Sequence, residues 1–312
     1  MIKTAMLLAA GFGQRLRPLT LVRPKPLFHV LNKTMLEWWA EFLSSAGVER
    51  IVINAHYMAP MMLEYIDKLA VSFKNKLEII PSLEEELMGT GGGLKKAAPL
   101  LNADNFLVIN ADIFSDFELV KISRQHLSAP GRLATLGLLE NIGPANVSVG
   151  EEGRILAFRQ PEKVEGELGR RTYCGVMAMS SEIFELIPPG FSDIIKVFSE
   201  AMDEGAEIHG WTYDPAIWQD MGTIGDYWRL NETLAAGRTI IHSTAKVEGK
   251  LSGWNVIGAQ AVIEKGADVE NCVIWPGSVV AAGASLKKAV ISGAIPEDHK
   301  IDGGFFCDVP GC

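Results

Sequence analysis

The sequence is poor in cysteine, and its few cysteines do not cluster. Four cysteines occur in 312 residues, and no two of them form a C-x-x-C pair. They are Cys174, Cys272, Cys307 and Cys312. This spacing does not favour a metal site, and we interpret Cys307 and Cys312 as thiols of a C-terminal tail.

Positive charge and long apolar runs are also lacking. The formal net charge of -9 argues against nonspecific binding to nucleic acid or to an anionic membrane surface. No apolar run is long enough to span a bilayer, and no signal peptide precedes the first expected strand. We therefore expect a protein of the reduced cytoplasm with neither a nucleic acid nor a membrane as its partner. A phosphate ligand then has to be held by local positive charge or by a metal ion.

The residues that are present are typical of a soluble globular protein of two domains, with 48% apolar and 21% charged residues. Strand and helix patterns alternate along most of the chain. This alternation predicts an α/β fold with a doubly wound, mostly parallel sheet covered on both faces. Strands are expected at residues 4–8, 49–55, 77–80, 105–112, 133–139, 154–158 and 173–179, and helices at 34–47, 60–69, 96–100, 181–186, 193–204 and 223–234.

The first expected strand leads into a loop rich in glycine, proline and cations. Gly11 and Gly13 allow a sharp turn that brings backbone amides close to an anion. Arg15 and Lys25 add positive charge, and the prolines of residues 18–26 stiffen the loop before a ligand arrives. The run contains neither G-x-x-x-x-G-K-[ST] nor G-x-G-x-x-G, so it is not a Walker loop or a dinucleotide fingerprint.

Two later stretches also lie just after an expected strand. Residues 89–93 are a glycine-rich cluster that opens a helix, and its amides suit a polar ligand, although a flexible turn fits the composition equally well. Asp112 ends a buried strand. Ligands of open α/β sheets bind beyond the carboxyl ends of strands, so Asp112 and the first loop are expected to converge. The alternative for Asp112 is a cap or turn residue.

Near the C-terminus the pattern changes to a period of six residues. Ile257, Ile263 and Val269 recur at this spacing, and Val280 and Leu286 resume it after a short slip. The period predicts a short left-handed β-helix of hexapeptide repeats. We expect domains at residues 1–238 and 239–302 and a tail at 303–312. So few coils need support from the first domain or from another subunit, and we expect a homo-oligomer.

Together these motifs resemble the signature of the sugar-1-phosphate nucleotidyltransferases, also called NDP-sugar pyrophosphorylases. The runs that carry the resemblance are residues 8–20 and 23–26, Gly89-Thr90-Gly91-Gly92, Asn110-Ala111-Asp112, Tyr173-Cys174-Gly175-Val176 and Trp218-Gln219-Asp220-Met221-Gly222-Thr223. The resemblance implies a Rossmann-like nucleotidyltransferase fold and an enzyme whose partners are an NTP and a sugar 1-phosphate. The products are then an NDP-sugar and pyrophosphate.

The resemblance also implies roles for individual residues. Arg15, Lys25, Asp112 and Asp220 are the expected catalytic residues, and the two aspartates are the expected ligands of a Mg²⁺ cofactor. Arg15 is expected to hold the leaving pyrophosphate, and Lys25 the phosphates nearer the reacting centre. The expected nucleotide-binding residues are Leu8, Ala9, Ala10, Gly11, Gly13, Glu84, Gly89, Thr90 and Gly91. Asn110 and Gly175 are expected on the sugar-phosphate side.

One run departs from the family pattern. Members usually have Phe-x-Glu-Lys-Pro where this chain has Phe158-Arg159-Gln160-Pro161. Strand alternation puts Arg159 and Gln160 on opposite faces, and we expect Gln160 to point toward the sugar phosphate. The positive charge for that phosphate is then expected from Lys163 or Arg171. The alternative is that these cations are solvated and the metal alone neutralises the phosphate.

The remaining hypotheses concern the substrate and the activity. The Gly-Thr-Gly-Gly-Gly run resembles members that transfer uridylyl or guanylyl groups, among them N-acetylmuramate-phosphate uridylyltransferases and mannose- and heptose-phosphate guanylyltransferases. UTP or GTP is therefore the expected nucleotide. A noncatalytic homologue that binds a nucleotide sugar is the alternative, favoured by Arg159 and Gln160. An acyltransferase in the repeat domain, with His242 and His299, is disfavoured because the repeat is too short for an acyl-CoA site.

Overall fold

A computed structural model describes residues 1–215 and 217–308 of the chain. The chain divides into two compact units, one made of Met1–Gly11 and Trp39–Trp218 and the other of Phe12–Trp38 and Gln219–Cys312. The signature loop is therefore split, because its first residues leave the sheet of the first unit and the rest belong to the second. The expected boundary between residues 238 and 239 stays a prediction.

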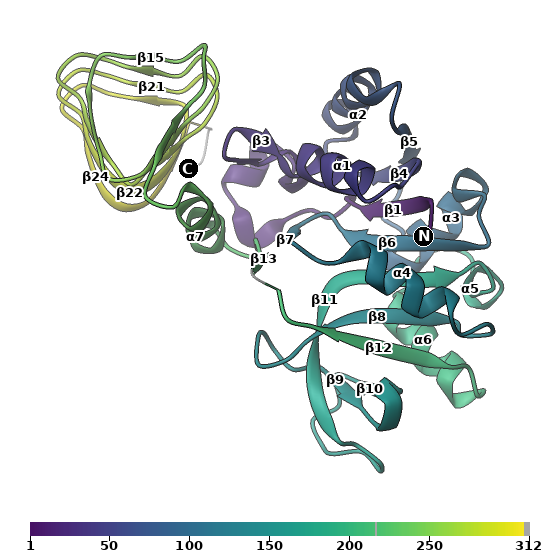
Figure 1. Ribbon diagram of the computed structural model, residues 1–312. Coiled ribbons are helices and arrows are strands. Elements are labelled where there is room, and N and C mark those ends of the chain that lie inside the picture. The colour runs from purple at the N-terminus through teal and green to yellow at the C-terminus, as the bar shows by residue number, and fades with distance from the viewer. Residues whose placement is uncertain (216, 309–312) are drawn as a thin grey trace. The chain divides into compact units, whose positions relative to one another are not determined.

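The first unit is built on a 9-stranded mixed sheet (Figure 1). Its centre is parallel, in the order β5 (Glu78–Leu83), β4 (Arg50–Ala55), β1 (Thr4–Leu8) and β6 (Asn105–Asn110). Next to β6 lies the long antiparallel strand β11 (Gly169–Ser180), which the sequence predicted only in part. The outer strands are β8 (Ala134–Leu139), β12 (Ile208–Tyr213), β9 (Val147–Val149) and β10 (Ile155–Phe158).

Helices cover both faces of this sheet, as predicted. Side chains of α3 (Gly89–Leu101) and α6 (Ile194–Asp203) form one apolar cluster with Met6, Val52 and Val108 of the central strands. In Figure 1, α4 (Leu119–Leu127) lies over the opposite face. The other helices are α1 (Met35–Ser45), α2 (Ala59–Phe73) and α5 (Ile183–Leu186), and the short elements are β7 (Ile113–Ser115) and η4 (Glu151–Gly153).

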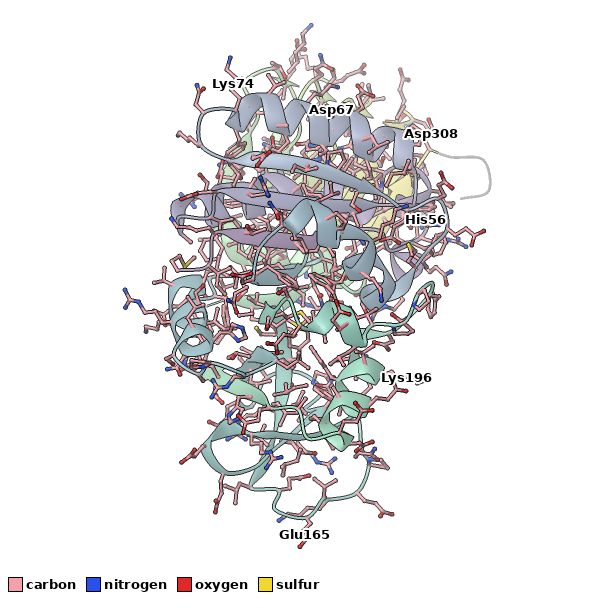
Figure 2. All side chains as sticks on the ribbon, turned by 90° about the vertical axis from the view of Figure 1, so that its right-hand side faces the viewer. His56, Asp67, Lys74, Glu165, Lys196 and Asp308 are labelled. Atoms are coloured by element: carbon pink, nitrogen blue, oxygen red, sulfur yellow. The ribbon has the colours of Figure 1, made fainter. Side chains whose placement is uncertain are left out.

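The helices follow the amphipathic pattern that predicted them. In α2, Met62, Ile66 and Leu69 are buried at helical spacing, whereas Asp67 points away from the ribbon into solvent (Figure 2). No helix of the described residues is long and apolar enough to cross a membrane. Strand β12 was not predicted from the sequence, because its alternation is interrupted by Gly210, where a Cβ would lie 2.1 Å from Leu138 Cδ1.

The second unit contains the predicted β-helix. Successive coils stack aliphatic side chains in register: Ile257 is paired with Ile274 and Ile274 with Ile291. These side chains are buried in one cluster, because each coil covers the apolar edge of the next. Its strands are β14 (Thr239–Ile241), β15 (Lys246–Val247), β16 (Lys250–Ser252), β17 (Asn255–Ile257), β18 (Val262–Ile263), β19 (Asp268–Glu270), β20 (Val273–Ile274), β21 (Val279–Val280), β22 (Ser285–Ser292), β23 (Ala294–Ile295) and β24 (Lys300–Cys307).

The end of the chain differs from the prediction of a tail. Strand β24 continues to Cys307 and pairs in parallel with β22, so residues 303–307 belong to the last coil. Cys307 is buried there, and Cys312 lies outside the described residues. Burial also raises the pKa of the Cys174 and Cys272 thiols to about 12, which keeps them protonated. The left hand of the β-helix and the homo-oligomer stay predictions.

The rest of the second unit is helical or irregular. Helix α7 (Ile224–Ala235) begins with an N-cap at Thr223, whose Oγ1 accepts from the Asp226 N–H at 3.1 Å. The Asp226 carboxylate in turn accepts from the Thr223 backbone, which completes a capping box. The remaining elements are η1 (Gln14–Leu16), η2 (Leu19–Leu21), η3 (Lys25–Leu27), β2 (His29–Val30), β3 (Lys33–Thr34) and β13 (Trp218–Asp220).

A buried histidine makes the stability of the first unit pH-dependent. His126 is 2% exposed, and its ring nitrogens lie 3.1 Å from Thr135 Oγ1 and 3.1 Å from Asn105 Oδ1. Burial, with a smaller effect of the Arg132 charge, lowers the pKa of His126 from 6.5 to about 4. The folded state therefore binds fewer protons than the unfolded state between these values. The contribution of the neutral His126 side chain to the free energy of unfolding is therefore fully present above pH 6.5 and is lost as the pH falls toward 4.

We predict that His126→Gln flattens this pH dependence. The wild-type free energy of unfolding should lose up to about 1.4 kcal/mol per pH unit below pH 6.5 because of this one residue. Urea unfolding at pH 7.5 and 5 measures the slope. His299→Gln, at an exposed histidine, is the matched control and should keep the wild-type slope. Equal slopes in the wild type and His126→Gln would contradict the prediction.

Candidate active site

The first part of the site lies at the carboxyl edge of the parallel strands. Leu8 at the end of β1 is paired with Asn110 at the end of β6, and the Ala111 N–H donates to Leu8 O at 3.1 Å. The chain runs outward from β1 through β4 to β5 and then returns to β6 on the other side of β1. This is the topological switch point at which open α/β sheets bind ligands. The sequence placed residues 8–11 and Asp112 at this edge, and the structure confirms that placement.

A buried network lies beneath this edge. The Ala9 N–H donates to Asn54 Oδ1 at 2.6 Å, and Asn54 Nδ2 donates to Glu84 Oε1 at 2.7 Å. The other carboxylate oxygen of Glu84 accepts from the Met88 N–H at 3.0 Å. Glu84 is 1% exposed. One carboxylate and one amide therefore connect the loop after β1 to the loop that opens α3, which are the two loops expected to bind the nucleotide.

Sequence reasoning missed Asn54 and expected Glu84 to contact the base. The available signal was a polar residue at the carboxyl end of an otherwise apolar buried strand, residues 50–55. Gly93 belongs to the same network, since a Cβ there would lie 2.6 Å from Glu84 Oε1. Close packing therefore favours glycine at this position of the cluster, in addition to the cluster's expected role toward a ligand.

The glycine-rich start of α3 packs tightly on the segment before α6. Gly89 has φ +71, and a Cβ there would lie 2.5 Å from the carbonyl oxygen of Ser192. The Gly91 N–H donates to that carbonyl at 2.9 Å, and Thr90 Oγ1 accepts from the Ile194 N–H at 3.0 Å. Glycine is required here because the two backbones nearly touch.

A cavity of about 360 Å³ opens beside these loops in the first unit. Three buried side-chain oxygens, Asn146 Oδ1, Tyr173 Oη and Ser192 Oγ, belong to residues of its wall and have no hydrogen-bond partner within the described chain. Burial raises the pKa of Tyr173 well above its usual value, so the hydroxyl keeps its proton. Buried polar groups are nearly always paired, so these oxygens are available to form hydrogen bonds with water or with a polar ligand. The other wall residues are Leu8, Leu87, Gly89, Thr90, Asn110, Val147, Phe158, Arg159, Met177, Phe191, Asp193, Ile194 and Ile195.

The residues expected around the sugar phosphate are arranged differently from the prediction. Strand β10 ends at Phe158, and Arg159 has φ +55, so strand alternation no longer applies and Arg159 lines the cavity. Arg159 Nη1 lies 3.8 Å from Asp193 Oδ2. Gln160 is exposed, and its backbone carbonyl accepts from Arg170 Nη1 at 2.8 Å. Gln160 is not part of the cavity wall, and its expected contact with a sugar phosphate stays a prediction.

Arg171 and Gly175, two other expected residues, contact other parts of the chain. Arg171 Nη2 lies 2.7 Å from Glu140 Oε1, and Lys163 is exposed. Gly175 has φ +89, and a Cβ there would lie 2.3 Å from Ile113 Cδ1, so this glycine makes room for Ile113. The roles of Lys163, Arg171 and Gly175 toward a sugar phosphate stay predictions.

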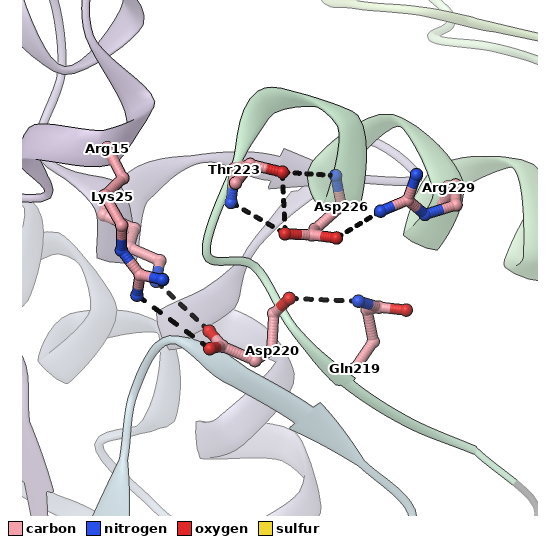
Figure 3. A network of polar contacts seen from close by, with 7 residues as sticks. All are labelled: Arg15, Lys25, Gln219, Asp220, Thr223, Asp226 and Arg229. Carbon is pink, nitrogen blue, oxygen red and sulfur yellow. Dashed lines mark hydrogen bonds and ion pairs between the residues drawn. The ribbon is translucent and has the colours of Figure 1, made fainter. Parts of the chain in front are cut away.

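The second unit brings together Arg15, Lys25 and Asp220 (Figure 3). Lys25 Nζ lies 3.7 Å from Asp220 Oδ1, and Arg15 Nη2 lies 4.0 Å from Asp220 Oδ2. The Lys25 side chain is only 8% exposed, whereas Arg15 is 71% exposed. A buried ammonium needs a nearby carboxylate, whereas the exposed guanidinium can reach a ligand. Gly222 is also in contact, since a Cβ there would lie 3.0 Å from Arg15 Nη1.

Glycine is also required inside the signature loop itself. Gly13 has φ +59, and a Cβ there would lie 2.8 Å from Thr20 Cγ2. Thr20 Oγ1 donates to the Gly13 carbonyl at 3.1 Å, which closes the turn. The loop is therefore shaped before a ligand arrives, as the glycines and prolines predicted.

The fold is that of an open α/β protein with glycine-containing loops at the carboxyl edge of its parallel strands. The family described as Nucleotidyl transferase matches residues 4–237, which is most of the chain. The chain therefore belongs to this family and is a nucleotidyltransferase, and the resemblance to the sugar-1-phosphate nucleotidyltransferases is confirmed.

Curated relatives are similar over nearly the whole chain. The mannose-1-phosphate guanylyltransferase of Mycobacterium tuberculosis is 30% identical over 305 residues, covering 91% of this chain and 83% of the relative. The probable mannose-1-phosphate guanylyltransferase 1 of Oryza sativa subsp. japonica is 32% identical, covering 95% and 83%. The UTP–glucose-1-phosphate uridylyltransferase of Synechocystis is 26% identical, covering 93% and 87%.

Solved structures share the fold. A UDP-glucose pyrophosphorylase in complex with UDP-glucose superposes with a TM-score of 0.62 at 19% identity, covering 76% of this chain and 100% of that one. A UDP-glucose pyrophosphorylase from Acinetobacter baumanii superposes with a TM-score of 0.62 at 15% identity, covering 77% and 96%. These similarities confirm the predicted nucleotidyltransferase fold.

We predict that Asn54→Ala destabilises the first unit, because it leaves the Ala9 N–H and Glu84 Oε1 buried without their partner. The free energy of unfolding should fall by about 1–3 kcal/mol. Urea unfolding measures the loss. The matched control is Asn75→Ala, at an exposed asparagine, and should change stability by less than about 0.5 kcal/mol. A loss no larger than that of Asn75→Ala would show that the network does not brace the two loops.

Proposed function

We propose that this protein transfers the nucleotidyl group of UTP or GTP to a sugar 1-phosphate, giving an NDP-sugar and pyrophosphate. The observation that carries the proposal is the cavity with its three unpartnered oxygens, next to Asn110 at the carboxyl edge of the sheet. Its volume lies within the range of small-molecule sites, and its mostly apolar wall carries a few polar groups that can fix the orientation of a ligand. The guanylyl- and uridylyltransferase names of the relatives support the choice of nucleotide.

The chemistry needs no nucleophile from the protein. A phosphate oxygen of the sugar 1-phosphate attacks the α-phosphorus, a new phosphorus–oxygen bond forms, and the bond to the β-phosphate bridging oxygen breaks. Pyrophosphate leaves with the electron pair of that bond. The work of the chain is to hold two anions in line and to neutralise charge. Arg15, exposed and cationic, suits the leaving pyrophosphate, and Lys25 suits the phosphates nearer the reacting centre.

The carboxylates of this chain suit a divalent metal only if substrate phosphates and water complete its coordination shell. No group of three or more His, Cys, Asp or Glu side chains within residues 1–215 and 217–308 is arranged to hold an ion. Mg²⁺, however, is commonly held by one or two carboxylates with substrate phosphates and water completing its shell. Asp112 and Asp220 are the two carboxylates that we propose for this role. When bound, Mg²⁺ neutralises charge that develops on the phosphates.

We predict that Asp112→Asn and Asp220→Asn each lower turnover about a hundredfold or more while the protein stays folded. Pyrophosphate release with a panel of NTPs and sugar 1-phosphates, with and without Mg²⁺, measures this effect. Asp214→Asn, an exposed aspartate near Asp220, is the control and should keep the wild-type rate. Near-normal turnover in either variant would remove that aspartate from the mechanism.

The same panel of NTPs and sugar 1-phosphates distinguishes the proposed enzyme from the main alternative, a noncatalytic homologue. A wild-type protein that binds nucleotide sugar but releases no pyrophosphate with any pair is a regulatory homologue. Turnover with at least one pair excludes that alternative and identifies the nucleobase and the sugar.

We predict that Tyr173→Phe weakens sugar phosphate binding without destabilising the protein. The Tyr173 hydroxyl has no partner within the described residues, so removing it should leave the free energy of unfolding unchanged or higher. The KM for the sugar phosphate should rise about fivefold or more through the lost hydrogen bond, and the KM for the NTP should change less. Tyr213→Phe is the control, because its hydroxyl donates to Asp116 O at 2.8 Å. That variant should lose stability and keep its KM values, and the reverse pattern would contradict the cavity's role.

A further inference from the structure

The segment after the signature loop packs against the β-helix within the second unit. The guanidinium carbon of Arg23 lies 5.4 Å from the centroid of the Trp275 ring, in a cation–π contact. Phe28 meets the same indole edge-on, with centroids 4.8 Å apart and an interplanar angle of 72°. Trp275 lies in the β-helix between β20 and β21. The two residues that contact it flank Pro24-Lys25-Pro26.

Hydrogen bonds reinforce this packing through α7. Trp275 Nε1 donates to Tyr227 Oη at 3.1 Å, and Tyr227 Oη donates to the carbonyl of His29 at 2.6 Å. The Leu31 N–H donates to Asn231 Oδ1 at 3.0 Å, from the next turn of α7. Residues 23–31 are therefore held at both ends.

The side chains at the centre of these contacts are buried. Trp275 is 2% exposed, and Phe28, Tyr227 and Asn231 are 0% exposed. Hydrogen bonds in such surroundings are costly to leave unmade, so the geometry is strongly specified. Arg23 Nη1 also donates to His29 Nδ1 at 2.7 Å, which requires a neutral imidazole. Burial and the Arg23 charge lower the pKa of His29 to about 3, so the imidazole is neutral at physiological pH.

Helix α7 connects these contacts to the carboxylate that faces Lys25. Asp220 precedes Thr223, the N-cap of α7, and Tyr227 lies in the first turn of that helix. The helix is thus anchored to the β-helix by the residue that also holds His29. Both partners of the Lys25–Asp220 ion pair depend on the same buried junction.

We propose that Trp275 is a positioning residue for Lys25, so that phosphate binding by the signature loop depends on the β-helix. The β-helix is then part of the active-site scaffold of the second unit, in addition to any role in assembly. The proposal rests on the proposed function for its kinetic consequence, but its structural consequence can be measured in the protein without substrates.

The test compares two tryptophans of the same junction. Trp275→Phe removes the indole N–H and keeps an aromatic ring. Trp228→Phe is the matched control: its Nε1 donates to Asn271 O at 2.9 Å, and its ring lies 5.0 Å from that of Trp254. Both variants lose one indole hydrogen bond between α7 and the β-helix region, but only Trp275 contacts Arg23 and Phe28.

The first readout is hydrogen exchange of the full-length protein without ligand. The Leu27, Phe28 and Leu31 amides donate to Pro24 O, Lys25 O and Asn231 Oδ1. In Trp275→Phe these amides should exchange about five to ten times faster, as expected for the loss of one hydrogen bond. In Trp228→Phe they should exchange at the wild-type rate, whereas the melting temperature of both variants should fall. Unchanged exchange in Trp275→Phe, or an equal increase in Trp228→Phe, would overturn the proposal.

The second readout is steady-state kinetics with the substrate pair found by the panel. Trp275→Phe should raise the KM for the NTP about fivefold, and Trp228→Phe should leave it unchanged. Tyr227→Phe should raise it as well, and the double variant Trp275→Phe/Tyr227→Phe should be no worse than Tyr227→Phe alone, because the two residues act in one chain of hydrogen bonds. Fully additive effects would contradict that chain. Absence of turnover with every pair refutes the proposed function, and the exchange experiment still decides the role of Trp275.

Discussion

The burial of the Lys25 ammonium is the constraint on which the second unit depends. A charge that is 8% exposed needs a carboxylate close by, and Asp220 lies 3.7 Å away. The two residues are far apart in sequence, so the chain has to bring them together with a rigid junction. The Thr223–Asp226 capping box fixes the start of α7, and Tyr227 joins that helix to His29 on one side and Trp275 on the other.

The first unit also contains a nearly buried ionisable side chain, Glu84, which connects two loops. Two of its loops leave β1 and β5, parallel strands with β4 between them, and Glu84, 1% exposed, bonds through Asn54 to the loop after β1 and directly to the loop before α3. Each unit therefore has one nearly buried ionisable side chain that contacts its glycine-containing loops or the segment that follows them. Fixed loops lose less conformational entropy when phosphates or a sugar bind.

Much of the fold could be predicted because its signals are local. Strand and helix periods predicted the central parallel strands and the β-helix, and Leu8 and Asn110 lie at the predicted edge. A local pattern does not show where parts of the chain that are distant in sequence approach each other. Gly175 is a glycine because Ile113 occupies the space of a Cβ, and residues 303–307 form a strand because β22 offers a free edge in register. Arg159 lines the cavity because β10 ends one residue earlier, which a periodic pattern does not reveal.

The sequence by itself determined the family, the order of the strands and helices, and the types of groups at the strand ends, because these depend on motifs and spacing along the chain. Only the tertiary structure decided which of these groups line the cavity and which hold the loops. Glu84 turned out to brace the backbone, Arg159 replaced Gln160 at the cavity, and Trp275 joined the β-helix to the Lys25 segment. These roles arise from burial and from contacts between residues distant in sequence, and neither is encoded in a local pattern.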